Sequence, residues 1–277
     1  MWLQRNPALS LLAAAILATT CAPPQPERTS KWDASDESNV EPIDHSPWQD
    51  ILDGYVDPDF QGVNVLNYAG LAASSEDTAK LGGYLEFLEG IDPRDYRRAE
   101  QMAYWINFYN ARTVKMVLDS YPVDTIREIH QGDVPMKGPW GDVCANIAGR
   151  NLTLDQIEHE ILRPIWRDER IHYAVNCAAY SCPQLIETAF TAANTESLLE
   201  AGAWAYVNSA RGVDVVDDEF VVLSSIYNWY PEDFGDTEES VIKHLTQYAD
   251  GELAAFLEGF GGTIDYDYDW KLNQPPR

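Results

Sequence analysis

The residues best suited to chemistry lie in one short segment, His172-Tyr-Ala-Val-Asn-Cys177-Ala-Ala-Tyr-Ser-Cys182-Pro. It starts within residues 171–175, whose apolar side chains predict a buried strand, and it continues into a loop that carries two thiols. Loops at strand ends are where folds often present reactive groups. A thiolate near an imidazole is a strong nucleophile at neutral pH, so Cys177 or Cys182 could act with His172 in acyl transfer or hydrolysis.

The same side chains allow two other interpretations. In an oxidising compartment Cys177 and Cys182 could form a structural disulfide, although closing so short a loop would add only about 2 kcal/mol of stability. A zinc ion could be bound by His159, His172 and the two cysteines, but their spacing is not one of the tight paired patterns of zinc sites. The sequence therefore predicts no metal ion and no other cofactor. Cys144 is predicted to be a small buried hydrophobic residue.

Three further polar residues lie among apolar ones on predicted helices. Glu158 and His159 belong to a helix that begins at a Thr-x-x-Gln capping box, Thr153 to Gln156. Asn107 lies on a helix that is apolar nearly all round. Buried polar groups must find partners, either in a structural network or in a catalytic site. The candidate catalytic residues are Cys177, Cys182, His172, His159, Glu158 and Asn107.

In a catalytic site of this kind, a third group orients the base. We expect either His172 or His159 to be the base, and Glu158, Asp233 or Asn107 to be the orienting group. Other catalytic templates are absent from the sequence: it has no glycine-rich phosphate loop, no His-Glu-x-x-His motif and no Gly-x-Ser-x-Gly motif.

The chain is strongly acidic, with 45 Asp and Glu residues against 19 Lys and Arg and a formal net charge of −26. Such a surface repels phosphate groups, which excludes nucleic acid as a partner. Residues 228–234 and 266–273 combine aromatic with acidic side chains, a composition that suits a groove for a peptide or a glycan. A non-catalytic binding module stapled by a disulfide is therefore an alternative to an enzyme.

The pattern of hydrophobic residues predicts an α+β fold. Residues 97–120 form the buried central helix, because apolar side chains occur nearly all round its middle. Other helical patterns cover residues 79–88, 153–163, 195–209, 238–249 and 252–260. Strand patterns cover residues 143–152, 171–175, 212–223 and 263–270. We expect a helix-rich single domain with a small, mostly antiparallel sheet around the central helix.

The N-terminal segment is typical of an exported protein. Residues 1–21 carry a single charge followed by a short apolar stretch, which predicts a secretory signal. Leu17-Ala-Thr-Thr-Cys21 resembles a lipoprotein cleavage box, so we expect a lipid anchor on Cys21 and a place in the cell envelope. Cleavage after Ala22 is the alternative, and Pro23 disfavours it. Residues 22–45, rich in proline and acid, predict a disordered tether, and residues 46–277 the folded domain.

Five blocks of sequence together resemble the family called domain of unknown function 547. They are residues 104–110, 152–159, 171–177, 181–183 and 268–273. The resemblance extends from Trp48 to Asn273 and implies a bacterial envelope protein, often exported, with no assigned activity. From the residues themselves, the leading hypothesis is a cysteine and histidine site of the papain or transglutaminase type. The binding module and the zinc site remain alternatives, and the sequence does not indicate the oligomeric state.

Overall fold

The computed structural model describes residues 31–60, 63–130 and 137–276, and it confirms the predicted α+β fold. The helices are α1 (Ser46–Tyr55), α2 (Tyr68–Ala73), α3 (Ser75–Glu89), α4 (Arg98–Ser120), α5 (Leu154–Gln156), α6 (Arg163–Trp166), α7 (Thr195–Val207), α8 (Ile226–Trp229), α9 (Glu238–Tyr248) and α10 (Gly251–Gly259). The strands are β1 (Val56–Phe60), β2 (Val63–Leu66), β3 (Ala145–Ile147), β4 (Arg150–Leu152), β5 (Val213–Asp217), β6 (Phe220–Ser224) and β7 (Thr263–Asp267).

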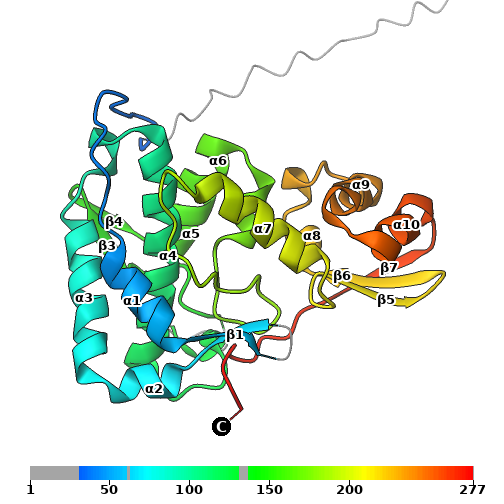
Figure 1. Cartoon of the computed structure of the whole chain (residues 1–277), viewed down its shortest axis with the longest axis horizontal. Coiled ribbons are helices and arrows are strands. Elements are labelled where there is room, and N and C mark those ends of the chain that lie inside the picture. Colours follow the sequence, from blue (N-terminus) through cyan, green and yellow to red (C-terminus); the bar gives the residue numbers. More distant parts are fainter. Residues whose placement is uncertain (1–30, 61–62, 131–136, 277) are drawn as a thin grey trace, which may run out of the picture.

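Helix α4 is the centre of the larger part of the molecule, as the sequence predicted. Its side chains from Glu100 to Ala111 are all buried, so both α3 and the loop segments that follow α4 in the sequence can pack on it. Tyr104, Trp105 and Phe108 are fully buried there. Figure 1 shows α1, α3 and α4 together on the left, with α7 leading toward a smaller lobe on the right.

The smaller lobe contains α8 to α10 and a three-stranded sheet in the order β5-β6-β7. β5 and β6 form the predicted hairpin, whereas β7 pairs parallel to β6. Parallel neighbours need a long crossover, which α9 and α10 supply. Two further hairpins, β1-β2 and β3-β4, form separate two-stranded sheets. The prediction of one sheet around the central helix was therefore wrong in detail, because the strands form three separate sheets. Most strand pairs are antiparallel, as expected.

Ordered structure begins before residue 46, so the predicted tether is wrong for residues 31–45. Trp32 is 6% exposed and packs edge-on against Trp105 of α4, with ring centroids 5.2 Å apart. The side chain of Gln101 donates a hydrogen bond to the carbonyl of Ala34 at 2.9 Å. A few buried groups thus hold a segment whose composition alone suggests disorder. The remainder of the tether, the signal segment and Cys21 lie outside the described residues.

Replacing Trp32 by alanine is expected to destabilise the whole domain, because it removes a buried indole from the face of α4. Large-to-small substitutions of buried aromatic residues cost about 3 kcal/mol or more. Urea unfolding at neutral pH measures the effect. Val40→Ala, at a side chain that is 66% exposed, is the control and should change stability by less than about 0.5 kcal/mol. An unchanged midpoint for Trp32→Ala would show that residues 31–45 do not belong to the folded domain.

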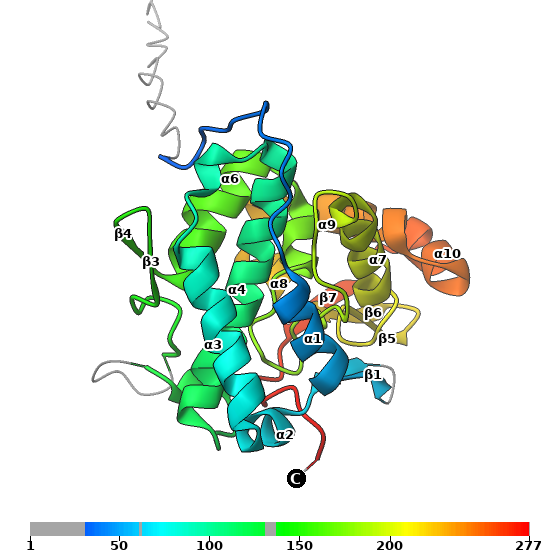
Figure 2. The ribbon, with the colours of Figure 1, turned by 60° about the vertical axis from the view of Figure 1, so that its left-hand side comes forward.

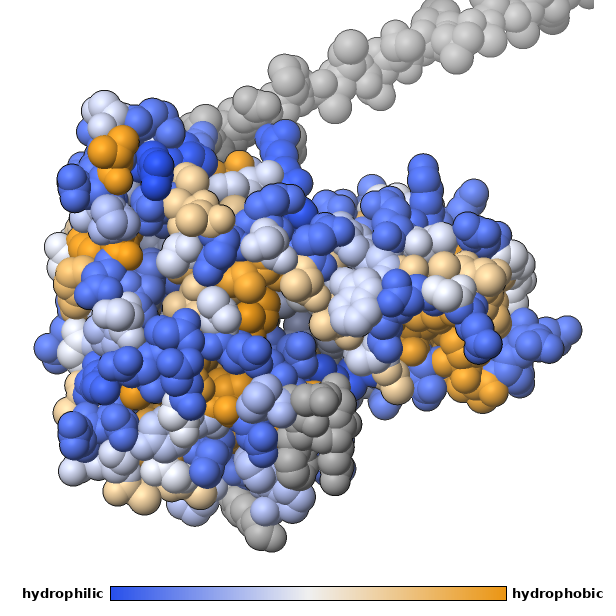
Figure 3. Space-filling view, in the orientation of Figure 1, coloured by the Kyte–Doolittle hydropathy of each residue, from blue (hydrophilic) through white to orange (hydrophobic). Residues whose placement is uncertain are grey.

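The surface reflects the acidic composition. Figure 3 shows the hydrophobic residues on this face as scattered areas between hydrophilic ones. Figure 2 shows α3 and α4 running side by side. None of the helices in the described ranges combines the length and the apolar composition needed to cross a lipid bilayer.

Candidate active site

The segment that carries His172 is a 3₁₀ helix, Glu169–Tyr173, and not the predicted strand. The Asp168 side chain caps it by accepting a hydrogen bond from the N–H of Arg170. A helical turn can also be buried on all sides, which explains why a short apolar run did not distinguish it from a buried strand. Ile171, His172 and Tyr173 are all buried.

Two asparagines hold the loop between His172 and Cys182 in place. Asn110 of α4 donates from Nδ2 to the carbonyl of Ala174 at 2.9 Å and accepts the N–H of Asn176 at 2.8 Å. Asn176 in turn donates to the carbonyl of Pro183 at 2.7 Å and accepts the N–H of Ala178 at 2.9 Å. Each buried amide satisfies backbone groups that no regular element serves. The loop is therefore fixed from both ends.

Asn107 does a similar structural task elsewhere. Its side chain donates to the carbonyl of Phe190 at 2.7 Å and accepts the N–H of the same residue at 3.0 Å. Its amide is fully buried and does not line the pocket described below. Of the candidate catalytic residues, the structure thus keeps Asn107 away from the others.

The C-terminal segment closes over the same loop. Tyr180 and Ser181 donate their N–H groups to the carbonyls of Lys271 and Asp269, at 2.7 and 3.1 Å. The N–H of Asn273 donates to the carbonyl of Ala178 at 2.8 Å. These bonds bring residues 268–273, one of the five blocks of sequence, beside the cysteines.

Glu158 and His159 lie in a π-helical turn. The capping box at Thr153 and Gln156 is present as predicted, but Ile157–Leu162 is a π-helix between α5 and α6, in which the N–H of Arg163 reaches the carbonyl of Glu158. Wide turns of this kind often occur at functional sites, because they change the direction of side chains without ending the helix. Here the turn places Glu158 beside His172 and His159 beside Glu158.

His172 is held by a carboxylate. Its Nε2 lies 2.6 Å from Oδ2 of Asp233, and its ring stacks on that of Tyr230 with centroids 4.6 Å apart. Arg163 donates from Nε to the same Asp233 oxygen at 2.5 Å. Burial raises the pKa of Asp233, but the hydrogen bonds from His172 and Arg163 outweigh it and lower that pKa to about 2. Asp233 is therefore ionised, so Nε2 of His172 carries the proton and Nδ1 is the basic nitrogen.

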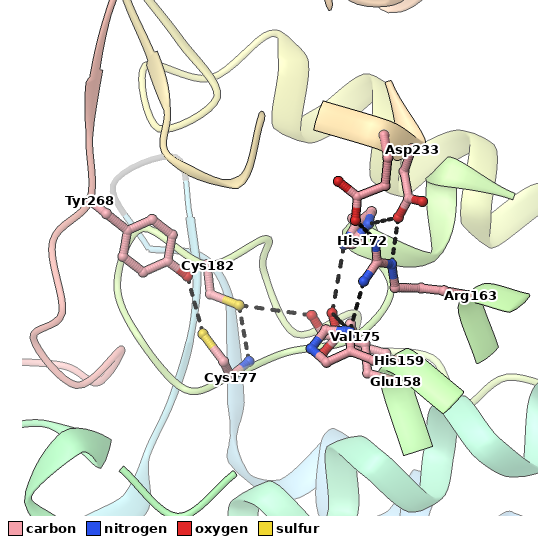
Figure 4. A network of polar contacts seen from close by, with 10 residues as sticks. Glu158, His159, Arg163, His172, Val175, Cys177, Cys182, Asp233 and Tyr268 are labelled. Carbon is pink, nitrogen blue, oxygen red and sulfur yellow. Dashed lines mark hydrogen bonds and ion pairs between the residues drawn. The ribbon is translucent and has the colours of Figure 1, made fainter. Parts of the chain in front are cut away.

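Glu158 faces both histidines. Its Oε1 lies 3.7 Å from Nδ1 of His172 and 3.9 Å from Nδ1 of His159. Nδ1 of His159 is also 3.0 Å from Nη1 of Arg163, which can only donate, so this nitrogen accepts. Figure 4 shows these residues as one connected group. Of the two histidines that line the pocket, His172 is therefore the one whose basic nitrogen accepts no hydrogen bond from Arg163 and lies beside a carboxylate able to stabilise its protonated form.

The two cysteines form a second group. Cys177 Sγ lies 3.1 Å from the hydroxyl of Tyr268, and Cys182 Sγ accepts the N–H of Cys177 at 3.0 Å. Hydrogen bonds from the Cys182 thiol, the Tyr268 hydroxyl and the N–H of Ala179 lower the pKa of Cys177, against opposing effects of burial and Glu158. Burial raises the pKa of Cys182. Of the two thiols, Cys177 thus has the lower pKa, and Cys182 is the more deeply buried.

Both groups line one pocket with a volume of about 270 Å³. Five of the six candidate catalytic residues contribute to its wall, namely Glu158, His159, His172, Cys177 and Cys182. Aromatic side chains supply much of the remainder, including Tyr109, Trp140, Trp229, Tyr230, Tyr268 and Trp270. Figure 4 shows the thiols on one side and the histidines on the other, with Val175 between them. The sequence blocks thus converge on one cavity.

The sequence left two other roles open for the cysteines, a structural disulfide and a zinc site. Cys144, Cys177 and Cys182 are free thiols, and burial raises the pKa of Cys144 to about 11. Within the parts of the chain that the structure describes, no group of three or more His, Cys, Asp or Glu side chains is arranged to hold a metal ion. The zinc interpretation therefore has no ligand set among the described residues.

Three members of the site escaped sequence analysis. Arg163 fixes Asp233 and His159, Tyr230 stacks on His172, and Tyr268 binds Cys177. Tyr268 belongs to one of the five blocks of sequence, which was the available signal. Tyr230 lies in residues 228–234, an aromatic and acidic segment that the sequence assigned to a ligand groove, whereas Arg163 has no motif that would have singled it out.

Fold and pocket together define an α+β protein with a thiol and an imidazole–carboxylate pair in one aromatic-walled cavity. Residues 93–207 match the family model described as "Protein of unknown function, DUF547", which supports membership of this family. The matched region contains both cysteines and both pocket histidines, but it ends before Asp233 and Tyr268. No curated protein and no solved structure matches the chain.

Proposed function

We propose that this protein is a cysteine-dependent hydrolase or acyltransferase, with Cys177 as nucleophile and His172 as general base. The observation that carries the proposal is the pocket in which Cys177 faces the cavity and His172 is fixed to Asp233 at 2.6 Å. Nucleophile, base and orienting carboxylate are the parts that covalent acyl transfer requires. Asp233 lies 61 residues along the chain from His172, and the pairing of such distant residues beside the pocket supports catalysis over a structural role.

The nucleophile is prepared without a histidine contact. Among the described residues, Cys177 Sγ has hydrogen-bond partners in Tyr268, Cys182 and the N–H of Ala179. Ala178, between the thiol and that N–H, has the left-handed backbone angle φ 66°, which costs energy for alanine and recurs at functional loops. The loop thus supplies donors to a thiolate, as thiol enzymes need.

His172 then acts as the general acid and base of the reaction. The Cys177 thiolate attacks the carbonyl carbon of the substrate, and the leaving group takes its proton from Nδ1 of His172, whose imidazolium form Glu158 stabilises at 3.7 Å. The tetrahedral intermediate collapses as the leaving group departs with that proton. Water, or another acceptor, next gives a proton to Nδ1 and attacks the acyl carbon, which breaks the thioester and restores Cys177. Asp233 holds the ring throughout.

The pocket limits the acyl group. A pocket of about 270 Å³ admits a small acyl group and not a folded polypeptide, and its aromatic wall favours an apolar or flat acyl group.

Intact-protein mass spectrometry after incubation with a panel of aryl esters and thioesters tests the proposal. We expect one acyl group per chain, on Cys177, that disappears with time in wild type. Cys177→Ala should acquire none, and Cys144→Ser should behave as wild type. The proposal fails if no ester acylates Cys177 while the same reagents modify the unfolded chain.

A binding function without catalysis is the second candidate. The observation that favours it is the aromatic cluster at the pocket, in which Trp229 and Trp270 stack with centroids 5.6 Å apart and Trp229 is 41% exposed. Such surfaces suit glycans or peptides. Calorimetric titration of wild type and of Cys177→Ala with oligosaccharides and short peptides distinguishes the two, since a binding module keeps its affinity in the variant and acquires no acyl group.

A further inference from the structure

Cys182 lies where it could form a bond with the reactive thiol. Its Sγ is 3.0 Å from the backbone nitrogen of Cys177. Since the N–Cα bond is about 1.46 Å, the Cα of Cys177 is within about 4.5 Å of that sulfur, which is compatible with disulfide geometry. The backbone between them already turns back on itself, because the N–H of Cys182 donates to the carbonyl of Ala179 at 3.1 Å. Closing the bond therefore needs side-chain rotation and little backbone movement.

The two thiols differ in what can reach them. Cys177 is half-buried, and Cys182 is only 4% exposed. The Cys182 Sγ also lies 3.8 Å from the carbonyl of Val175, and the guanidinium of Arg211 donates to the carbonyl of Cys182 at 2.8 Å. A reagent in the pocket thus meets Cys177 before Cys182. A dithiol that exchanges with disulfides has this arrangement, in which the attacking thiol, here Cys177, is accessible and its neighbour, here Cys182, is shielded.

We propose that Cys182 is a resolving thiol, which converts a mixed disulfide on Cys177 into a reversible Cys177–Cys182 disulfide. The co-reactant is a small disulfide such as oxidised glutathione. The Cys177 thiolate attacks one of its sulfurs and releases the first thiolate. Cys182, losing its proton, then attacks Cys177 Sγ and releases the second. The small disulfide is reduced by two electrons to two thiols, which take up the two protons that the cysteines lose.

This reaction would control the pocket. The sulfur that faces the cavity becomes one half of a disulfide, and its contact with Tyr268 is lost. The regulatory consequence rests on the proposed function, since only a nucleophilic Cys177 is switched off in this way. Formation of the bond itself does not depend on any acyl chemistry.

The test equilibrates native full-length protein with glutathione buffers of graded redox potential, followed by acid quenching and intact mass spectrometry with peptide mapping. We expect wild type to lose two hydrogens, with Cys177 joined to Cys182 and no accumulating glutathione adduct, and to recover fully in reducing buffer. Cys182→Ser should instead retain one glutathionyl group on Cys177. Cys177→Ser should form neither species, and Cys144→Ser should match wild type.

Two results would overturn the inference. One is a stable glutathione adduct on Cys177 in wild type that is as abundant as in Cys182→Ser. The other is the absence of both species in wild type while the urea-unfolded chain reacts. A circular dichroism spectrum equal to that of wild type confirms that each variant is folded. Disulfide formation without esterase activity would reject only the proposed function, and acylation of Cys177 without disulfide formation only the resolving role.

Discussion

Replacing His172 by asparagine is expected to lower kcat/KM for ester turnover by roughly 100- to 10,000-fold, the usual contribution of a general base. The same variant should leave alkylation of Cys177 by iodoacetamide nearly unchanged at neutral pH. The reason is geometric: Cys177 is held by Tyr268 and by the N–H of Ala179, whereas Nδ1 of His172 faces Glu158. Acylation by an activated ester should therefore persist, and the acyl group should accumulate because its hydrolysis needs the base.

His159→Asn is the matched control, since His159 lines the same pocket but its Nδ1 accepts from Arg163. It should reduce turnover far less than His172→Asn. Pre-steady-state mass spectrometry of the acyl form, combined with labelling rates from pH 5 to 9, separates the two steps. If His172→Asn abolished alkylation and acylation together, the imidazole would be acting directly on the thiol. The separation of the cysteines from the histidines would then not describe the working enzyme. Equal losses in both histidine variants would also contradict the assigned roles.

The elements that sequence analysis predicted well are those with long periodic patterns. The central helix α4 is buried nearly all round its middle, and α7 and α9 each bury one face. The errors occurred where tertiary contacts decide local structure. Residues 169–173 are a capped helical turn instead of a strand, and residues 31–45 are ordered because Trp32 and Ile43 are buried against the body of the protein.

The site was predictable where its residues share a local block. The contacts between distant segments were not predictable, apart from Asp233, which the sequence offered as one of three possible orienting groups. Glu158, His172 and Cys177 were recognised as candidate catalytic residues from their types and neighbours. Their partners come from far along the chain: Asp233 is 61 residues from His172, and Tyr268 is 91 residues from Cys177. The sequence suggested an imidazole beside the thiol because the two are close in the chain. The loop fixed by Asn110 and Asn176 instead separates them across the pocket.

Two buried histidines outside the pocket should make the protein sensitive to acid. His45 and His244 are 4% and 6% exposed. Burial lowers the pKa of each to about 4, with Asp44 opposing the shift at His45 and His172 adding to it at His244. Each ring hydrogen-bonds a buried tyrosine hydroxyl at 2.7 Å, His45 to Tyr84 and His244 to Tyr173. Both are therefore neutral in the folded protein at pH values where the unfolded chain would protonate them.

In the unfolded chain these histidines bind protons below pH about 6.5, whereas in the folded protein they do so only below pH about 4. The free energy of unfolding should therefore fall as the pH falls from about 6.5 to about 4. A shift of about 2.5 pKa units corresponds to about 3 kcal/mol for each histidine. The two histidines together would remove much of the free energy of unfolding, which is roughly 5–15 kcal/mol for a typical domain.

Urea unfolding at pH 7, 5.5 and 4 measures the decline in the free energy of unfolding. His45→Gln and His244→Gln should each flatten it by about half, even if each lowers stability at pH 7. A free energy of unfolding that is constant from pH 7 to 4 would mean that these rings are hydrated in solution, and that the packing around Tyr84 and Tyr173 is looser than the structure has it.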